Sequence, residues 1–331
     1  MKTPPFWYRD SGALEAALLA PLAVASGAFA LGVAARGAAY GAGVLRAEPV
    51  GAKVVSLGNV VAGGAGKTPI AIFLAQRLSR AGRRVAVVSR GYGGAERLCA
   101  VERETPVSAS GDEALLVKRR VPEAIVVVGR DRVAAARHAV SLGADVVLLD
   151  DGFQHRRLAR DLDVVVVDAA RPFGNGRLLP RGPLREPASA LRRAGLVWTT
   201  GADGAGEGVR SRLVATALVR ADGESRAPAW LAGKRVFALA GIARPERFFA
   251  SVRALGAELV DCLELPDHAA ISEAMAARAA RADADAIVLT EKDAARWPAS
   301  GAAPHVFALR VDVELLSGEA RLDAALAQAL A

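Results

Sequence analysis

The chain has 331 residues, which exceeds the size of most single compact cores and predicts two domains. A hydrophobic share of 52% argues against a disordered protein, and two distant cysteines argue against a disulfide scaffold or a cysteine-bound zinc site. The formal net charge of +8 fits an anionic partner or, alternatively, reflects a GC-rich genome; no recognition motif points to nucleic acid, so we expect no nucleic-acid partner.

The N-terminal segment carries a long stretch without charge. Residues 16–35 are uncharged and long enough to span a membrane, but they are rich in alanine and contain Pro21. Aromatic residues 6–8 precede the stretch, as interfacial anchors often do, and the mixed charges before it argue against a signal peptide. We expect residues 1–45 to form a membrane-associated helical segment; a true span and a buried core helix are the alternatives.

Residues 46–201 alternate short apolar runs with segments of helical pattern. Runs of Val, Ile and Leu separated by helices indicate a parallel sheet that is covered on both faces, which is a doubly wound α/β domain. The expected strands are 52–58, 83–91, 123–129, 145–151 and 162–169, and the expected helices are 68–82, 112–120 and 132–143.

The pattern breaks at 202–233, where turn-rich sequence predicts a hinge with one or two strands. Alternation returns in 234–331 and predicts a second, smaller α/β domain. Its expected strands are 235–241, 257–265, 285–293 and 305–315, and its expected helices are 245–256, 271–282 and 319–331.

The segment GGAGKTP lies between an expected strand and an expected helix, as a phosphate-binding loop does. The glycines let backbone N–H groups turn inward, and the helix N-terminus adds partial positive charge. Val61 stands where the common loop has its first glycine, which indicates a variant loop; a glycine turn without ligand is the alternative. The expected nucleotide-binding residues are Gly63, Gly64, Ala65, Gly66, Lys67, Thr68 and Pro69.

Such a loop requires an acidic partner at the end of another buried strand. Asp150 and Asp151 end an apolar strand, where α/β sheets place ligand sites. Two adjacent carboxylates at that position are unfavourable unless a cation or hydrogen bonds satisfy them. They are therefore candidates for a magnesium site, with a solvated turn as the alternative.

The group that receives the phosphate has to be inferred from other segments. Asp112 and Glu113 begin a helix; Asp112 is either a general base that takes a hydroxyl proton or a helix cap. Asp267 and His268 precede a helix of the second domain, and His268 would orient Asp112 if the domains close; a structural histidine is the alternative.

The loop at 171–187 is rich in arginine, glycine and proline. Arginines on a fixed loop bind phosphate or carboxylate well, whereas a solvated basic loop is the alternative. The expected substrate-binding residues in it are Arg171, Asn175, Arg177 and Arg181.

These segments together resemble the tetraacyldisaccharide 4'-kinases, the inner-membrane lipid A kinases of Gram-negative bacteria. The shared motifs occur in order from residue 54 to residue 293, and the RGYGG and FGNGRLLP motifs are more specific than a lone GKT. They are SLGNVVAGGAGKTP, VVSRGYGG, SGDEALL, VVGRDR, LLDDGFQHRRLARD, FGNGRLLPRGPLREP, AGIARPERFF, LPDH and LTEKD.

The resemblance implies a P-loop NTPase-like fold, with ATP and Mg²⁺ as cofactors and transfer of the γ-phosphate to the 4'-hydroxyl of a tetraacylated disaccharide 1-phosphate. It also implies a lipid partner and a place at the cytoplasmic face of the inner membrane, peripheral or N-terminally anchored. The matching site residues are Lys67, Asp112 and His268 for catalysis and Thr68, Glu113, Asp150 and Asp151 around the metal, with Gln154 and His155 in the same motif.

One position departs from the family pattern. The family often has a second histidine and an aromatic residue after Pro-Asp-His, where this chain has Ala269 and Ala270. The main rival interpretation is a membrane-associated nucleotide switch ATPase with a variant phosphate loop. Such a switch often has a lysine where this chain has Ala62, and it has no need of Asp112.

Overall fold

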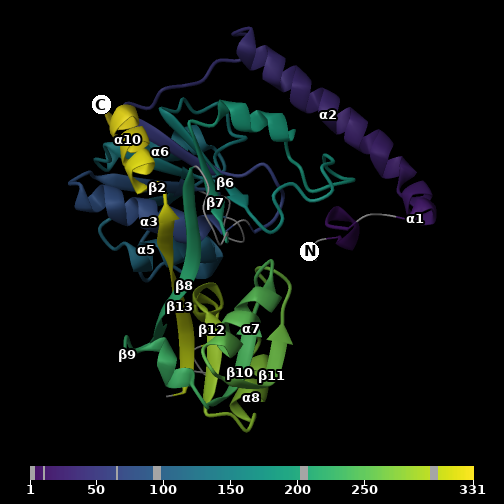
Figure 1. Cartoon of the computed structure of the whole chain (residues 1–331). Helices are drawn as coiled ribbons and strands as arrows, with labels where there is room; N and C mark the ends of the chain where they lie inside the picture. Colours follow the sequence, from purple (N-terminus) through teal and green to yellow (C-terminus); the bar gives the residue numbers. More distant parts are fainter. Residues whose placement is uncertain (1–3, 10–11, 65, 92–97, 202–207, 299–304) are drawn as a thin grey trace.

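The computed structural model describes the chain except residues 1–3, 10–11, 65, 92–97, 202–207 and 299–304. Ala65 and the first residues of the expected hinge at 202–233 therefore lie outside the described residues. The described strands form one sheet in the order β11-β10-β12-β13-β8-β7-β6-β1-β5-β2-β4-β3, and β9 pairs with β8. The sheet runs through two structural units, which are joined by the long strands β8 and β13 (Figure 1).

The larger unit is the expected doubly wound α/β layer. The predicted strands and helices of residues 46–201 are all present, while β3 and β7 were not predicted. Its parallel strands are β1 (Lys53–Gly58), β2 (Val85–Ser89), β4 (Ile125–Val128), β5 (Val146–Asp150), β6 (Leu162–Asp168) and β7 (Leu196–Thr200), with β3 (Cys99–Val101) antiparallel at the edge. Its helices are α3 (Lys67–Arg80), α4 (Val107–Ser110), α5 (Asp112–Arg120) and α6 (Arg132–Ser141), and η2 (Ala188–Arg193) is a 3₁₀ turn.

Alternation along each strand places apolar side chains on both faces of this sheet. Val55 and its neighbours pack against Leu74 of α3 and Leu115 of α5, whereas Val54 packs on the other face with Ala136 of α6. Because both faces are buried, the strands read as unbroken apolar runs, which is why they could be recognised.

The smaller unit repeats this arrangement with fewer elements. Helix α7 covers one face of its sheet and helices α8 and α9 cover the other. Its elements are β10 (Arg235–Ala240), α7 (Pro245–Ala254), β11 (Glu258–Glu264), α8 (Glu273–Ala280), β12 (Ala286–Thr290) and α9 (Glu291–Ala295), and the connection to it contains β9 (Ser225–Arg226) and η3 (Pro228–Leu231).

Strands β8 (Val209–Val219) and β13 (Val306–Ser317) turn the carboxyl ends of the two parallel sheets toward each other. β7 pairs in parallel with the start of β8, with Trp198 opposite Val209, and β12 pairs in parallel with the start of β13, with Ile287 opposite Val306. Since β8 and β13 are antiparallel, the strands of each unit point at the other unit. Ligand sites in α/β sheets lie beyond the carboxyl ends of the strands, so both units direct a site to the region between them.

The closing helix α10 (Glu319–Leu330) belongs to a different core from the one we expected. Leu322 and Leu326 are buried in the same cluster as α3 and β1 of the larger unit. Arg77 of α3 also pairs with Asp323. We therefore infer that residues 319–331 are part of the larger unit and not of the smaller domain expected at 234–331.

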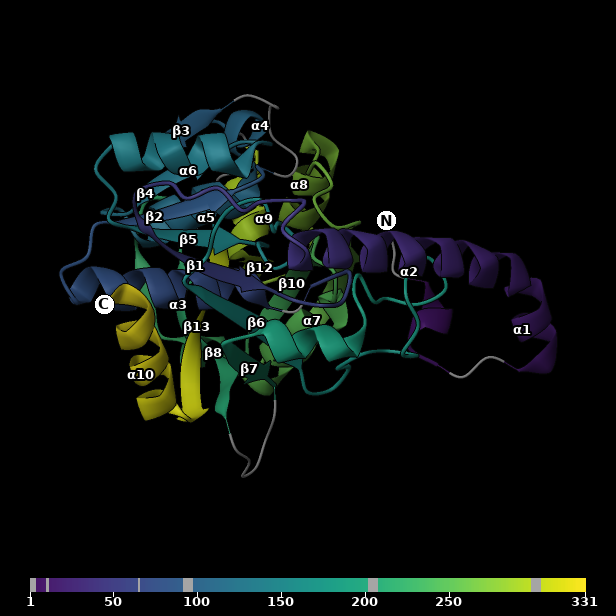
Figure 2. The same ribbon diagram turned by 90° about the horizontal axis from the view of Figure 1, so that it is seen from above.

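The N-terminal segment forms η1 (Pro5–Trp7), α1 (Ala13–Leu18) and α2 (Ala20–Gly41), and α2 extends away from the body of the molecule (Figure 2). No residue described in α2 is buried, which excludes the buried core helix among the alternatives. Helix α2 is long and apolar enough to cross a membrane by length and composition. Ser26 ties it to the basic loop, because its hydroxyl donates to the carbonyl of Leu178 at 2.9 Å.

The position of α10 can be tested by truncating the buried leucine in its first turn. The Leu322 side chain is fully buried, so Leu322→Ala should lower the free energy of unfolding by about 2–5 kcal/mol. Chemical denaturation of the full chain measures the change. Gln328→Ala, on the exposed face of the same helix, should stay within about 0.5 kcal/mol of wild type; equal effects of both variants would contradict the packing of α10.

Candidate active site

The phosphate loop connects β1 to α3. Gly66 is the N-cap of α3 with φ 75°, a left-handed conformation that favours glycine. Pro69 lies in the first turn, where its missing N–H has no helical partner to lose. The Lys67 ammonium lies 3.2 Å from Asn59 Oδ1 and 3.2 Å from Asp151 Oδ1, so its cation is held beside the acidic end of β5.

The adjacent aspartates at that end have opposite electrostatic environments. Burial raises the pKa of Asp150 to about 7, and the nearby Glu113 carboxylate adds to the effect. Burial also acts on Asp151, but Lys67 and Arg185 overcome it and lower the pKa of Asp151 to about 2. Arg185 donates from Nη1 to both oxygens of Asp151, at 2.9 and 2.8 Å.

The Glu113 carboxylate contacts polar side chains of both units. Its Oε1 accepts a hydrogen bond from the Thr68 hydroxyl at 3.3 Å and forms an ion pair with Lys292 of the smaller unit. Burial alone would raise the pKa of Glu113, but the charge of Lys292 holds it below its usual value. The Lys292 pKa is raised in turn, because Glu113 outweighs the effect of burial.

The donor set in this corner fits a magnesium ion bound together with phosphate. Mg²⁺ prefers oxygen ligands and usually takes one or two carboxylates, with phosphate and water completing its shell. The hydroxyl of Thr68 and the carboxylates of Glu113 and Asp150 are hard oxygen donors of this kind. Within the described residues, no group of three or more His, Cys, Asp or Glu side chains could hold a metal by itself.

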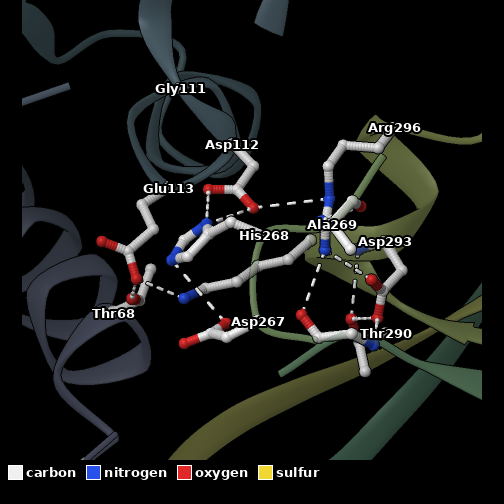
Figure 3. Close-up of polar contacts among 12 residues, drawn as sticks. Thr68, Gly111, Asp112, Glu113, Asp267, His268, Ala269, Thr290, Asp293 and Arg296 are labelled. Atoms are coloured by element: carbon white, nitrogen blue, oxygen red, sulfur yellow. Dashed lines mark hydrogen bonds and ion pairs between the residues drawn. The ribbon is translucent and has the colours of Figure 1, made fainter. Parts of the chain in front are cut away.

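Asp112 and His268 meet across the two units (Figure 3). His268 Nδ1 lies 2.9 Å from each carboxylate oxygen of Asp112, and Asp112 is only 2% exposed. Burial would raise the Asp112 pKa, but the hydrogen bond and the charge of His268 hold it below its usual value. The same hydrogen bond raises the pKa of His268. An ionised carboxylate only accepts, so Nδ1 of His268 is the donor.

Backbone strain also marks this site. Among the described residues, Asp151 (φ 50°) and His268 (φ 60°) are the non-glycine residues with positive φ. Such conformations cluster at functional sites, where the surrounding structure holds them in place. Both of these residues were predicted from the sequence as site residues.

Arg296 supports the Asp112–His268 pair from behind (Figure 3). Its Nε lies 3.5 Å from Asp112 Oδ2, and its Nη2 lies 2.5 Å from Asp293 Oδ1. Its Nη1 donates to the backbone carbonyl of Ala269 at 2.5 Å. At position 269, where the chain departs from the family pattern, the backbone therefore makes the polar contact.

Three polar residues of this site, Asn59, Lys292 and Arg296, were not assigned a role from the sequence, and Arg185 was expected only as one of the phosphate- or carboxylate-binding arginines of its loop. Lys292 and Arg296 lie in or just after the LTEKD motif, and Arg185 belongs to the arginine-rich loop, so their segments had been singled out. Asn59 had no signal of its own. Each acts through a partner that is distant in the chain, except that Asn59 reaches Lys67 eight residues away.

The residues expected to bind substrate lie on the loop next to α2 and not beside Asp112. The side-chain amide of Asn175 donates to the carbonyls of Phe6 and Arg181, at 3.0 Å each, so it shapes the loop. The guanidinium of Arg171 lies 4.9 Å from the Tyr8 ring centroid. Arg177 and Arg181 line a cavity of about 450 Å³ between this loop and α2, together with apolar side chains such as Phe173 and Leu178.

Gln154 and His155 follow the acidic strand end. Gln154 Nε2 donates to the carbonyl of Asn59 at 3.0 Å, so it braces the residue that contacts Lys67. Burial, with the charge of Arg132, lowers the pKa of His155 to about 4. His155 is therefore neutral at physiological pH.

Removing the imidazole should change the titration of Asp112. In His268→Ala the carboxylate loses its main stabilising partner while its burial persists, so we expect the pKa of Asp112 to rise. NMR titration of ¹³C-labelled aspartate carboxyl groups, assigned with Asp112→Asn, measures it. His138→Ala, on α6, should leave this pKa unchanged; an unchanged Asp112 titration in His268→Ala would show that the pair does not control the charge.

Comparisons with known proteins give the family. The tetraacyldisaccharide-1-P 4'-kinase (LpxK) family model matches residues 16–331. A tetraacyldisaccharide 4'-kinase of Anaeromyxobacter sp. (strain Fw109-5) is 49% identical over 98% of this chain and 95% of its own. One of Xanthomonas euvesicatoria pv. vesicatoria (strain 85-10) is 42% identical over 89% of this chain and 87% of its own.

A solved structure supports the same assignment. The crystal structure of "apo" form LpxK from Aquifex aeolicus in complex with ATP has a TM-score of 0.79 and 27% identity, and covers 95% of this chain and 99% of that one. The expected P-loop NTPase-like α/β fold is thereby confirmed. The chain belongs to the tetraacyldisaccharide-1-P 4'-kinase family.

Proposed function

We propose that the protein transfers the γ-phosphate of ATP to the 4'-hydroxyl of tetraacyldisaccharide 1-phosphate, a step of lipid A biosynthesis. The observation that carries this proposal is the buried Asp112–His268 pair, which lies next to Glu113 and hence to Thr68 of the phosphate loop. A phosphate loop alone binds nucleotide. A buried, ionised carboxylate held beside it supplies the base that a sugar hydroxyl needs.

Asp112 accepts the proton of the 4'-hydroxyl as that oxygen attacks the γ-phosphorus, and the bond to the β-phosphate oxygen breaks to leave ADP. His268 orients the carboxylate through Nδ1 and stabilises its charge before the proton arrives. Lys67 and the loop N–H groups from Gly63 to Thr68 hold the phosphates.

Thr68, Glu113 and Asp150 are the residues that would hold magnesium, and Asp151 would act beside them through its ion pairs with Lys67 and Arg185. When bound, the ion neutralises charge on the β- and γ-phosphate oxygens. The raised pKa of Asp150 supports this assignment, because a cation bound beside this buried carboxylate would stabilise its ionised form. Lys292 contributes by keeping Glu113 ionised.

The lipid acceptor explains the N-terminal segment and the basic loop. A disaccharide with four acyl chains stays in the bilayer, so we propose that the enzyme works at the cytoplasmic face of the inner membrane with α2 on or in the bilayer. Arg171, Arg177 and Arg181 then face anionic lipid or the substrate phosphate, and Asn175 holds their loop. The rival nucleotide switch has no use for the Asp112–His268 pair.

Incubation of the purified protein with γ-labelled ATP and the acylated disaccharide 1-phosphate tests the function. We expect label at the 4' position of the sugar. Label released only as inorganic phosphate would favour an ATPase switch and overturn the proposal.

The base can be tested separately from nucleotide binding. Asp112→Ala should lower kcat by about 10²–10⁴-fold, because proton transfer to a positioned base contributes that much, while the Kd for ATP stays close to wild type. Steady-state kinetics and calorimetric ATP titration measure the two effects. Asp267→Asn is the matched control: this carboxylate also approaches His268, at 3.6 Å from Nε2, and its loss should be far milder. Near-wild-type turnover of Asp112→Ala would remove the base assignment.

The membrane role of α2 predicts a loss of binding when its apolar surface is made charged. Val24 and Leu31 of α2 are exposed, and an aspartate at the bilayer centre costs about 2.5–3.5 kcal/mol. The double variant Val24→Asp, Leu31→Asp should therefore leave the membrane fraction, as measured by vesicle co-sedimentation. Leu213→Asp, at an exposed leucine of β8, should sediment like wild type. Equal sedimentation of all three proteins would place the membrane contact elsewhere.

A further inference from the structure

A loop of the smaller unit lies directly on the phosphate loop. This contact loop, residues 241–244, leaves the carboxyl end of β10 and enters α7. A Cβ built on Gly64 would lie 3.0 Å from the Cβ of Ala243, so any larger residue at position 64 would be crowded against this loop. Arg244 completes the contact, because its Nη2 donates to the Gly64 carbonyl at 3.1 Å.

Asp168 fixes the position of Arg244. This carboxylate ends β6, the strand next to β1, and is only 2% exposed. Nη2 of Arg244 pairs with it, and Arg247 Nη1 lies 3.0 Å from its Oδ2. Burial would raise the Asp168 pKa, but the two arginines hold it below its usual value. The anchor is therefore ionised, and Arg244 spans from it to the phosphate loop.

The contact that Arg244 makes with the phosphate loop is to a backbone carbonyl, that of Gly64. In a planar trans peptide the C=O and N–H groups point in opposite directions. A donor bound to the Gly64 carbonyl therefore restrains the orientation of the loop backbone at Gly64. The other terminal nitrogen of Arg244, Nη1, is buried and has no hydrogen-bond partner in the described part of the chain. An oxyanion bound at the loop would supply an acceptor for it.

We propose that Arg244 is a positioning residue for the phosphate loop, through which the smaller unit raises the affinity of the larger unit for ATP. The proposal rests on the proposed function only in that the loop binds ATP. In this proposal Asp168, at the end of β6, holds Arg244 of the smaller unit, and Arg244 in turn holds Gly64 of the loop that binds the nucleotide.

Arg247 provides a matched control. It lies on α7 close to Arg244 and shares the Asp168 carboxylate, but its described contacts do not include the phosphate loop. If the arginines served only to hold the two units together through Asp168, replacing either should have similar consequences. A specific effect on nucleotide affinity should follow the residue that reaches Gly64.

The experiment is calorimetric titration of ATP into the full chain without lipid acceptor, for wild type, Arg244→Gln and Arg247→Gln. We expect the Kd for ATP to rise about tenfold or more in Arg244→Gln and to stay within about twofold in Arg247→Gln. In steady-state assays the KM for ATP should rise in Arg244→Gln, with little change in the KM for the lipid or in the pH profile. A role limited to stability would not separate these constants.

Arg244→Lys covers the case in which the glutamine variant does not fold. Lysine keeps a cation beside Asp168, but its ammonium lacks the rigid, planar geometry of the guanidinium, whose Nη2 contacts both Asp168 and Gly64, so ATP affinity should again fall. Equal weakening in the Arg244 and Arg247 variants, or wild-type affinity in both Arg244 variants, would overturn the proposal. Absence of ATP binding by the wild type would instead overturn the proposed function.

Discussion

Buried negative charge beside the phosphate loop is the constraint on which the rest of the structure depends. Burial acts to raise the pKa of Asp112, Glu113 and Asp150 alike. Asp112 and Glu113 nevertheless stay ionised, because His268 and Lys292 reach them from the smaller unit. Removing His268 leaves an uncompensated charge on Asp112, which is only 2% exposed, and such a charge is strongly unfavourable. The electrostatics of the site therefore also hold the two units together.

The sheet explains how those partners arrive. Since β8 and β13 are antiparallel and each continues the parallel strands of its own unit, the carboxyl edges of both units face the same region. Asp168 at the end of β6 can then meet Arg244 just after β10. The contacts between the units are made by strand ends and the loops that follow them, which are the positions where α/β proteins place ligands.

Much of the fold could be predicted because its strands and helices have recognisable local sequence patterns. Strands buried on both faces appear as apolar runs, and the phosphate loop has its glycines beside Lys67 and Thr68. β3 is too short for a pattern, and β7 (LVWTT) is too mixed for one. The amphipathic pattern of α10 predicts a helix but does not say which core receives it.

The contacts within the site were less predictable than the fold. The pairing of Asp112 with His268 was one of two alternatives that the residues left open, and the family resemblance favoured it, because no local pattern relates residues 156 positions apart. Lys292 and Arg296 were missed for the same reason, although their segment had been recognised. Geometry between units is a long-range property, and periodicity carries no information about it.

The departure at Ala269 shows what the site needs from that position. Nη1 of Arg296 contacts the carbonyl of Ala269, and Nη2 reaches both Asp293 and the Gly241 carbonyl. Every residue type offers a backbone carbonyl, so a histidine at 269 would add nothing to this contact. The Ala269 side chain packs with the apolar core of the smaller unit instead. The support of Asp112 by Arg296 therefore depends on the path of the backbone after His268, and it is compatible with alanine at this position.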